Sequence, residues 1–145
     1  MDTLIIEGPQ RIDGEVQVNG AKNGVLPLMV CALLTRGKLE LSNVPILTDV
    51  RIMVELLQNY GASVNFDESE KTLIIDCSDI NNSYAPAKIV AKMRASIWAL
   101  APVVARLGHA KIALPGGDAI GDKKSGVRKI DLHTCLLYTS DAADE

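Results

Sequence analysis

The spacing of apolar and polar residues predicts short strands and helices in alternation. Residues 4–7 and 15–18 flank a Gly-Pro turn, and the second segment alternates Val16 and Val18 with polar neighbours, so a β-hairpin is expected at the start. Residues 23–35 are apolar on every side, which is typical of a helix buried all round. Gly37 is expected to end this helix, and residues 38–41 alternate as a strand.

A second helix is expected to begin at Thr48 or Asp49, either of which can cap it, and to stop at Gly61. Its apolar residues lie at positions i, i+3, i+4 and i+7: Val50, Met53, Val54 and Leu57. Residues 62–66 and 72–76 flank an acidic turn and predict a second hairpin. The expected unit is therefore β, α, β, α, β, β.

The same order begins again, which indicates an internal repeat. Residues 94–107 predict another mostly apolar helix, Gly108 ends it, and residues 111–114 alternate as a strand. Aligning Gly37 with Gly108, an offset of 71 residues, brings Asn23 onto Arg94. The pattern predicts an α/β (α+β) chain in which the same end of two helices carries polar groups.

Composition narrows the class of protein. The chain has 145 residues, 48% of them hydrophobic, and a net charge of −3, which suits a globular protein and argues against general nucleic-acid binding. The start lacks the features of a secretory signal, and the longest apolar run is too short to cross a bilayer, so a cytoplasmic protein with no membrane contact is expected. Cys31 and Cys77 are expected to be reduced packing residues.

Residues 114–133 combine a Gly-Gly turn, Asp118 and four cations in one loop, an arrangement that suits a small anion. Glycine lets backbone N–H groups approach a ligand closely. It is equally open that Asp118 is an ordinary turn residue and that the cations belong to a solvated charged loop. The loop is an insertion relative to the first repeat, and it carries the cations Lys123, Lys124, Arg128 and Lys129.

Lys22 and Asn23 stand where the first buried helix begins, and the N-terminus of a helix attracts phosphate. Alternatively, Asn23 is an N-cap and Lys22 a solvated residue. Arg94 stands at the equivalent place in the second repeat and suits bidentate pairing with phosphate or carboxylate, unless it caps a carbonyl or pairs with Asp79. Trp98 is expected in the core. His109 and His133 have no partners at ligand spacing, so no metal site is expected.

Four motifs occur in order: GAKN at 20–23, MRASIWAL at 93–100, LPGGDAIG at 114–121 and DLH at 131–133. Together they closely resemble the enolpyruvyl transferase family, in particular its members that act on UDP-N-acetylglucosamine in bacterial cell-wall synthesis. The resemblance covers residues 1–133. It implies repeated βαβαββ units, the inside-out α/β barrel fold, with a site between two domains, of which about one and a half units are present here.

The resemblance implies transfer of the enolpyruvyl group of phosphoenolpyruvate to the 3′-hydroxyl of UDP-N-acetylglucosamine, the first committed step of peptidoglycan synthesis, with no metal or other cofactor. Lys22 and Asn23 match residues that bind phosphoenolpyruvate, and Arg94 matches one that contacts the substrates. Arg128, which also faces the phosphate, begins a segment that matches the lining of the UDP-sugar site and continues with Lys129, Ile130, Asp131 and Leu132.

Asp118 stands where most members of the family have a cysteine, the residue thought to protonate C3 of the enol. A free aspartate has a pKa near 3.9, so donation at neutral pH requires that desolvation or the substrate's charge raise it, and loop closure over the substrate is expected to do so. The carboxylate also lacks the alkylatable thiolate on which fosfomycin acts, which predicts resistance to fosfomycin.

Residues 134–145 continue no earlier pattern and resemble translated sequencing-adapter sequence, so no function is assigned to them. Members of the family continue well beyond DLH, and we expect the isolated chain, without its C-terminal part, to be inactive. Two other functions stay open. One is the shikimate-pathway enolpyruvyl transferase, 3-phosphoshikimate 1-carboxyvinyltransferase, and the other is a non-catalytic module that binds phosphate or a nucleotide.

Overall fold

The computed structural model describes residues 3–9, 11–116 and 134–137. From residue 22 to residue 76 its elements follow the predicted order, and a short strand and a short helix that were not predicted come before residue 94. The first repeat contains α1 (Lys22–Cys31), the 3₁₀ helix η1 (Ala32–Leu34), β1 (Lys38–Leu41), α2 (Thr48–Asn59), β2 (Ser63–Asp67) and β3 (Thr72–Asp76). The second contains β4 (Tyr84–Ala85), α3 (Ala87–Val90), the 3₁₀ helix η2 (Arg94–Ala99), α4 (Leu100–Leu107) and β5 (Lys111–Ile112).

The first repeat forms an antiparallel three-stranded sheet in the order β1-β3-β2. The central strand β3 pairs Leu73 with Leu41 on one side and with Phe66 on the other. Leu73 and Ile75 of this strand are fully buried, because they point to the face that the helices cover. The hairpin predicted around residues 67–70 is confirmed, with its strands at Ser63–Asp67 and Thr72–Asp76.

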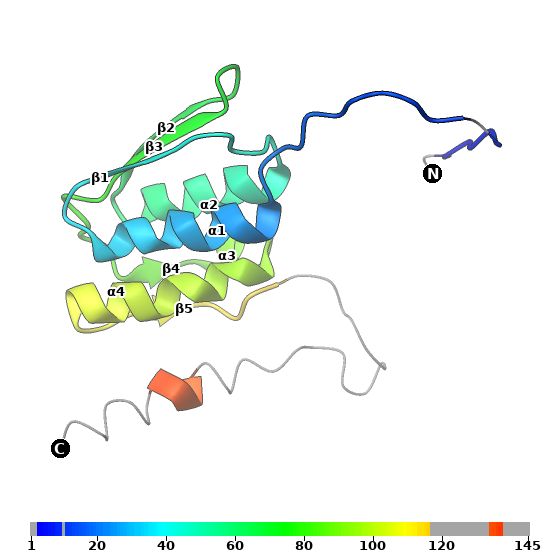
Figure 1. The fold of residues 1–145 in the computed structure, drawn as a ribbon. Coiled ribbons are helices and arrows are strands. Elements are labelled where there is room, and N and C mark those ends of the chain that lie inside the picture. Colours follow the sequence, from blue (N-terminus) through cyan, green and yellow to red (C-terminus); the bar gives the residue numbers. More distant parts are fainter. Residues whose placement is uncertain (1–2, 10, 117–133, 138–145) are drawn as a thin grey trace, which may run out of the picture.

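The helices lie against one face of this sheet. Figure 1 shows the sheet on one side of α1 and α2, with α3, α4 and the short strands β4 and β5 on the other side. The strands β4 and β5 are parallel and pair Tyr84 with Lys111. The core lies between these layers, and its largest fully buried side chains include Met29, Leu33, Met53, Leu56, Leu57 and Tyr60.

The β-hairpin predicted at the start is not formed. Residues 3–9 and 11–19 have no regular secondary structure, and Figure 1 shows this segment extending away from the body of the fold. A strand is stable only when its backbone groups and its apolar face find partners. None of the described elements covers this segment, and its large apolar residues are 77–95% exposed: Leu4, Ile5, Ile6, Ile12, Val16 and Val18.

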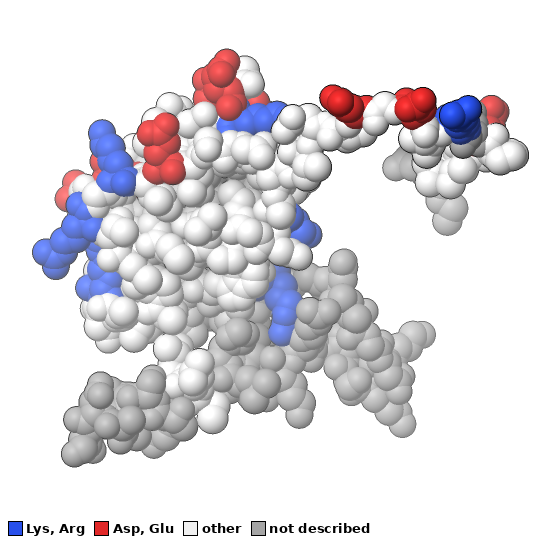
Figure 2. All heavy atoms as spheres, in the orientation of Figure 1, with Lys and Arg blue, Asp and Glu red and all other residues white. Residues whose placement is uncertain are grey.

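The prediction that residues 23–35 are buried all round is also wrong. One face of α1 is buried, but Leu28 is 51% exposed, and Cys31 and Leu34 are exposed as well. Figure 2 shows a broad surface without charged side chains over α1 and α4. Cys31 is therefore not a packing residue, whereas Cys77 is buried as predicted.

Two predicted helix ends differ from the structure, and a third is confirmed. Leu47 occupies the N-cap position of α2, without a side-chain cap, and Thr48 and Asp49 already lie inside the helix. Thr35 rather than Gly37 follows η1. Gly61, the predicted stop of α2, does adopt a positive φ of 106° directly after the helix.

The single helix predicted at residues 94–107 is divided into η2 and α4. Pro102 explains the division, because proline cannot donate to the carbonyl of Trp98 and its ring crowds that carbonyl in an α-helix. Trp98, predicted to lie in the core, is partly exposed. No helix in the described ranges combines the length and apolar composition needed to cross a membrane.

Candidate functional site

The N-terminus of α1 presents unpaired backbone donors beside a cation. Ala21 occupies the N-cap position, so Asn23 is not the N-cap, and no side chain caps the helix. The N–H groups of Gly24 and Val25 donate to the Ala21 carbonyl at 3.1 and 3.0 Å. None of the described residues accepts a hydrogen bond from the N–H groups of Lys22 or Asn23. This end of α1 therefore carries a partial positive charge and two free donors.

The turn that leads into α1 is held against the loop between β1 and α2. A Cβ atom at Gly20 would lie 2.0 Å from the backbone oxygen of Asn43, so only glycine permits this approach. One residue earlier, Asn19 Oδ1 accepts a 2.8 Å hydrogen bond from Lys71 Nζ. The same lysine's carbonyl accepts a 2.9 Å bond from the N–H of Val44. The start of α1 is thus fixed relative to the loop before α2.

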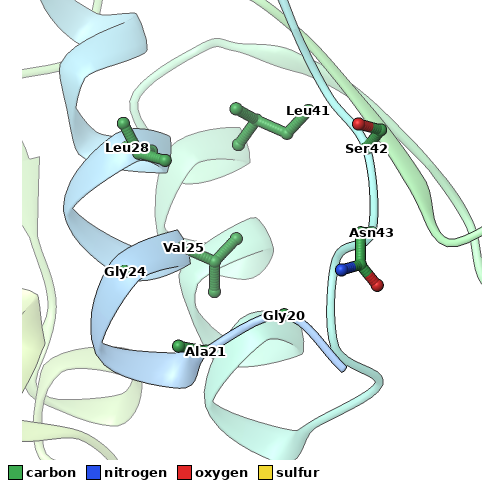
Figure 3. Close-up of a pocket in the computed structure, with 8 residues that line it drawn as sticks. All are labelled: Gly20, Ala21, Gly24, Val25, Leu28, Leu41, Ser42 and Asn43. Carbon is green, nitrogen blue, oxygen red and sulfur yellow. The ribbon is translucent and has the colours of Figure 1, made fainter. Parts of the chain in front are cut away.

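A small hollow of about 200 Å³ lies between the start of α1 and this loop. Figure 3 shows Val25 and Leu41 beside the hollow, with Gly20 and Asn43 at one end of it. The walls are mostly apolar, and the polar side chains come from the β1–α2 loop. Its lining residues are Gly20, Ala21, Gly24, Val25, Leu28, Leu41, Ser42 and Asn43.

Lys22 forms an ion pair with a residue that the sequence analysis treated only as a helix cap. Its Nζ lies 3.0 Å from Oδ2 of Asp49, which stands in the first turn of α2. Both helices begin at the same end of the molecule (Figure 1). No sequence pattern links residues 22 and 49, because only the packing of α1 against α2 brings them together.

Arg94 is the first residue of η2, directly after the buried Met93. Its side chain is half-buried, and none of the described residues forms a hydrogen bond or ion pair with its guanidinium. The alternative pairing with Asp79 is therefore not observed. Two residues later, the Ser96 hydroxyl is fully buried without a hydrogen-bond partner among the described residues. Arg94 is placed where an arriving anion would find an unpaired cation.

The segment that ends at Gly116 runs towards the same region. The N–H of Gly116 donates a 3.1 Å hydrogen bond to the carbonyl of Val90, and a Cβ at Gly116 would lie 1.6 Å from the oxygen of Ala91. This contact places Gly116 against the segment that leads into Arg94. Figure 1 shows residues 113–116 running to the end at which α1 and α2 begin.

The remaining predicted site residues lie outside the described residues: Asp118, Arg128, Lys129, Ile130, Asp131 and Leu132. In the part of the chain that the structure describes, Lys22, Asn23 and Arg94 come from two elements, α1 and η2, that contact each other. The described ranges contain no group of three or more metal-ligating side chains. The arrangement of free N–H donors and cations is suited to a phosphate-bearing ligand.

Sequence reasoning missed Asp49, Gly20 and Gly116 as parts of this region. The glycines carried a signal, since each stands in a motif quoted above, but their close contacts are with residues far away in the sequence. Asp49 carried no signal beyond its place in a helical first turn.

Known proteins resemble this chain over most of its length. Residues 6–124 match the EPSP synthase (3-phosphoshikimate 1-carboxyvinyltransferase) family. UDP-N-acetylglucosamine 1-carboxyvinyltransferase of Rickettsia bellii is 48% identical over 139 residues, which cover 94% of this chain and 32% of that protein. The protein of the same name from Rickettsia prowazekii is 46% identical over 147 residues, covering 100% of this chain and 34% of its own.

The chain thus spans about a third of the length of these relatives. Among solved structures, the enolpyruvyl transferase NikO from Streptomyces tendae shares the fold, with a TM-score of 0.64 at 24% identity. That match covers 70% of this chain and 23% of NikO. The family match over residues 6–124 includes most of the chain, and it takes in α1, η2 and the segment that ends at Gly116. This chain belongs to the EPSP synthase (3-phosphoshikimate 1-carboxyvinyltransferase) family.

Proposed function

We propose that these residues take part in transferring the enolpyruvyl group of phosphoenolpyruvate to the 3′-hydroxyl of UDP-N-acetylglucosamine. The observation that carries the proposal is the packing of α1, which begins with Lys22 and Asn23, on η2, which begins with Arg94. Among the described residues, neither the first N–H groups of α1 nor the Arg94 guanidinium has a hydrogen-bond partner. The identity of 46–48% with relatives named for this reaction supports the choice of acceptor. The activity belongs to a protein of the relatives' length, and the 145 residues alone are inactive.

The proposed chemistry has two steps. Asp118 gives a proton to C3 of phosphoenolpyruvate while the sugar hydroxyl oxygen bonds to C2 and passes its own proton to water. Water then takes a proton from C3, and the electron pair of that C–H bond restores the double bond, now in the enolpyruvyl ether, as the C2–O bond to phosphate breaks and inorganic phosphate leaves. The phosphate bears negative charge throughout, so Lys22, Arg94 and the N–H groups of α1 stabilise both the bound substrate and the departing group.

The remaining residues take the roles that the family resemblance implies. Asn23 binds phosphoenolpyruvate beside Lys22. Arg128 faces the phosphate, and it lines the UDP-sugar side together with the next four residues. Desolvation and the substrate's negative charge keep Asp118 protonated until it donates. The protein acts in the cytoplasm, in peptidoglycan synthesis, with no metal or cofactor, and a carboxylate at residue 118 makes it resistant to fosfomycin.

The test is phosphate release by the protein encoded by the complete gene, with phosphoenolpyruvate and each acceptor in turn. We expect release with UDP-N-acetylglucosamine and none with shikimate 3-phosphate. The shikimate acceptor is a real alternative, because the matched family is described by that activity. Release only with shikimate 3-phosphate would reverse the assignment. Binding of phosphoenolpyruvate without release from either acceptor would indicate a non-catalytic module.

Two substitutions test the role of Arg94. Arg94→Ala removes a cation that faces the proposed site, so we expect kcat/KM to fall by at least 100-fold, about 2.7 kcal/mol. Arg36→Ala is the matched control, since this exposed arginine follows η1, at the opposite end of the α1–η1 segment from Lys22. It should leave kcat/KM within about twofold of the unchanged protein. Equal effects of the two substitutions would remove Arg94 from the site.

A further inference from the structure

We propose that Asp49 is a positioning residue for Lys22. Its carboxylate holds the lysine ammonium beside the N-terminus of α1 before the substrate arrives. The inference rests on the proposed function, because it takes Lys22 to be a ligand of phosphoenolpyruvate. Asp49 belongs to none of the four motifs, and the sequence pattern presents it only as part of a helix start.

The geometry permits Lys22 to bind both groups at once. Nζ of Lys22 lies 3.0 Å from Oδ2 of Asp49, and the two side chains are 51% and 31% exposed. An ammonium has three N–H donors, so one bond to Asp49 leaves two for an incoming phosphate or carboxylate oxygen. The more exposed lysine faces solvent, while the carboxylate is the more enclosed partner. Asp49 therefore restrains the ammonium without occupying all its donors.

The backbone at both ends of the pair is already fixed. Gly20 packs against the oxygen of Asn43 so closely that a Cβ would lie 2.0 Å away, which anchors the entry to α1. The first turn of α2 is closed by hydrogen bonds from the N–H groups of Val50 and Arg51 to the Leu47 carbonyl, at 3.1 and 3.2 Å. The long Lys22 side chain is the remaining source of freedom, and each of its bonds has about three staggered rotamers.

The other ion pairs of α2 within the described residues provide a contrast. Arg51 pairs with Glu68 at 2.8 Å, and Glu55 pairs with Lys92 at 2.7 Å. Both join α2 to neighbouring segments along its side. The Asp49 pair alone reaches the free N-terminus of α1. Exposed ion pairs contribute little to stability, so the effect expected of Asp49 is on where the Lys22 ammonium lies rather than on folding.

The experiment compares Asp49→Asn with the matched control Glu55→Gln, in the protein encoded by the complete gene. Calorimetry gives the Kd of phosphoenolpyruvate, and steady-state kinetics give KM and kcat. Without the Asp49 carboxylate, the Lys22 ammonium lies beside the N-terminus of α1 for only a fraction of the time. The apparent affinity for phosphoenolpyruvate falls by the same fraction. We expect Kd and KM for phosphoenolpyruvate to rise about five- to tenfold in Asp49→Asn, with the KM for UDP-N-acetylglucosamine, kcat and thermal midpoint nearly unchanged. In Glu55→Gln, the Kd and KM for phosphoenolpyruvate should stay within about twofold of those of the unchanged protein.

Charge alone predicts the opposite result, because removing a carboxylate favours the binding of an anion. Unchanged or tighter binding of phosphoenolpyruvate by Asp49→Asn therefore overturns the inference. A double-mutant cycle adds a second criterion: in a Lys22→Gln background, Asp49→Asn should have no further effect on Kd. A further loss in that background would show that Asp49 does not act through Lys22.

Two outcomes separate this inference from the proposed function. A protein that binds phosphoenolpyruvate but releases no phosphate overturns the proposed function, while the Kd of Asp49→Asn still decides the inference. A protein that binds no phosphoenolpyruvate overturns both. If neither Asp49→Asn nor Asp49→Ala folds, the role of Asp49 is structural and the inference fails.

Discussion

Arg106 of α4 donates a 3.1 Å hydrogen bond from Nη1 to the carbonyl of Leu33, at the end of η1 and 73 residues earlier in the chain. The same guanidinium also donates to the carbonyls of Thr35, Cys77 and Ser78. The carbonyls of Leu33 and Thr35 lie at the end of η1 and just beyond it, and those of Cys77 and Ser78 directly follow β3, so regular hydrogen bonding stops at both places. The half-buried Arg106 side chain thus joins α4, in the second repeat, to the ends of η1 and β3 in the first repeat.

Arg106→Met should destabilise the chain strongly. The substitution keeps much of the apolar stem but leaves four carbonyls without their charged donor, and each hydrogen bond to a charged group contributes about 1.5–3 kcal/mol. Because solvent can replace part of these bonds, we expect the free energy of unfolding in urea to fall by about 3 kcal/mol. The control Arg51→Met removes an exposed pair with Glu68 and should cost much less, because solvent screens such pairs. Equal losses would contradict the prediction.

Gly20→Ala and Gly24→Ala should have opposite effects on stability. A Cβ at Gly20 would overlap the backbone oxygen of Asn43, so the turn must move, at a cost of about 1–3 kcal/mol. A Cβ at Gly24 would meet only the Ala21 side chain at 3.9 Å, inside α1. Alanine there should stabilise the helix by about 0.5–1 kcal/mol. Urea unfolding of both variants tests the pair, and a stabilising Gly20→Ala would show that the close approach is not formed.

Tyr60 should make stability fall in alkaline solution. It is 1% exposed, and burial raises the pKa of its hydroxyl from 10.0 to about 12. Between these values only the unfolded chain loses the proton, so ionisation favours unfolding. The contribution of Tyr60 is complete below pH 10 and falls by up to about 1.4 kcal/mol for each pH unit above it.

Urea unfolding between pH 9 and 11 measures this slope. Tyr60→Phe has no hydroxyl to ionise, so its stability should decline less steeply over the same range than that of the unchanged chain. Parallel declines in the two proteins would show that Tyr60 does not contribute.

Cys31 and Cys77 should react with iodoacetamide at very different rates. Cys31 is exposed on α1, whereas Cys77 is buried and desolvation raises the pKa of its thiol. In a Cys135→Ser background, mass spectrometry should find rapid labelling of Cys31 and labelling of Cys77 only as urea unfolds the chain. Cys31→Ser should abolish the rapid phase. Rapid labelling that persists in Cys31→Ser would show that the layer over Cys77 opens readily.

Residue 118 should decide the response to fosfomycin. In the protein encoded by the complete gene, the Asp118 carboxylate is a poor nucleophile towards an epoxide, so prolonged incubation should leave enolpyruvyl transfer intact. Asp118→Cys supplies a thiolate and should introduce time-dependent, irreversible inactivation, with one covalent adduct seen by mass spectrometry. Irreversible inactivation of the Asp118 protein would contradict the assignment of this residue.

Local patterns predicted the elements whose stability depends on near neighbours. The periodicity of Val50, Met53 and Leu57 is that of α2, and the acidic turn joins β2 to β3 as expected. The alternation of apolar and polar residues at 15–18 predicted a strand that is not formed. A strand requires a neighbouring strand to pair with, and alternation along one segment does not supply it. The equivalence of Lys22–Asn23 with Arg94 in the two repeats stays a prediction, while the contact between α1 and η2 is an observation of the structure.

The sequence by itself determined which residue types were available: two cations at the starts of equivalent helices, glycines in the flanking turns, and motifs sufficient to indicate the family. The tertiary structure alone decided which of these groups meet. Lys22 reaches Asp49, Gly20 touches Asn43 and Gly116 lies against Ala91 only because helices and loops distant in the chain pack together. Such contacts depend on distances in space, which residue spacing along a chain does not specify.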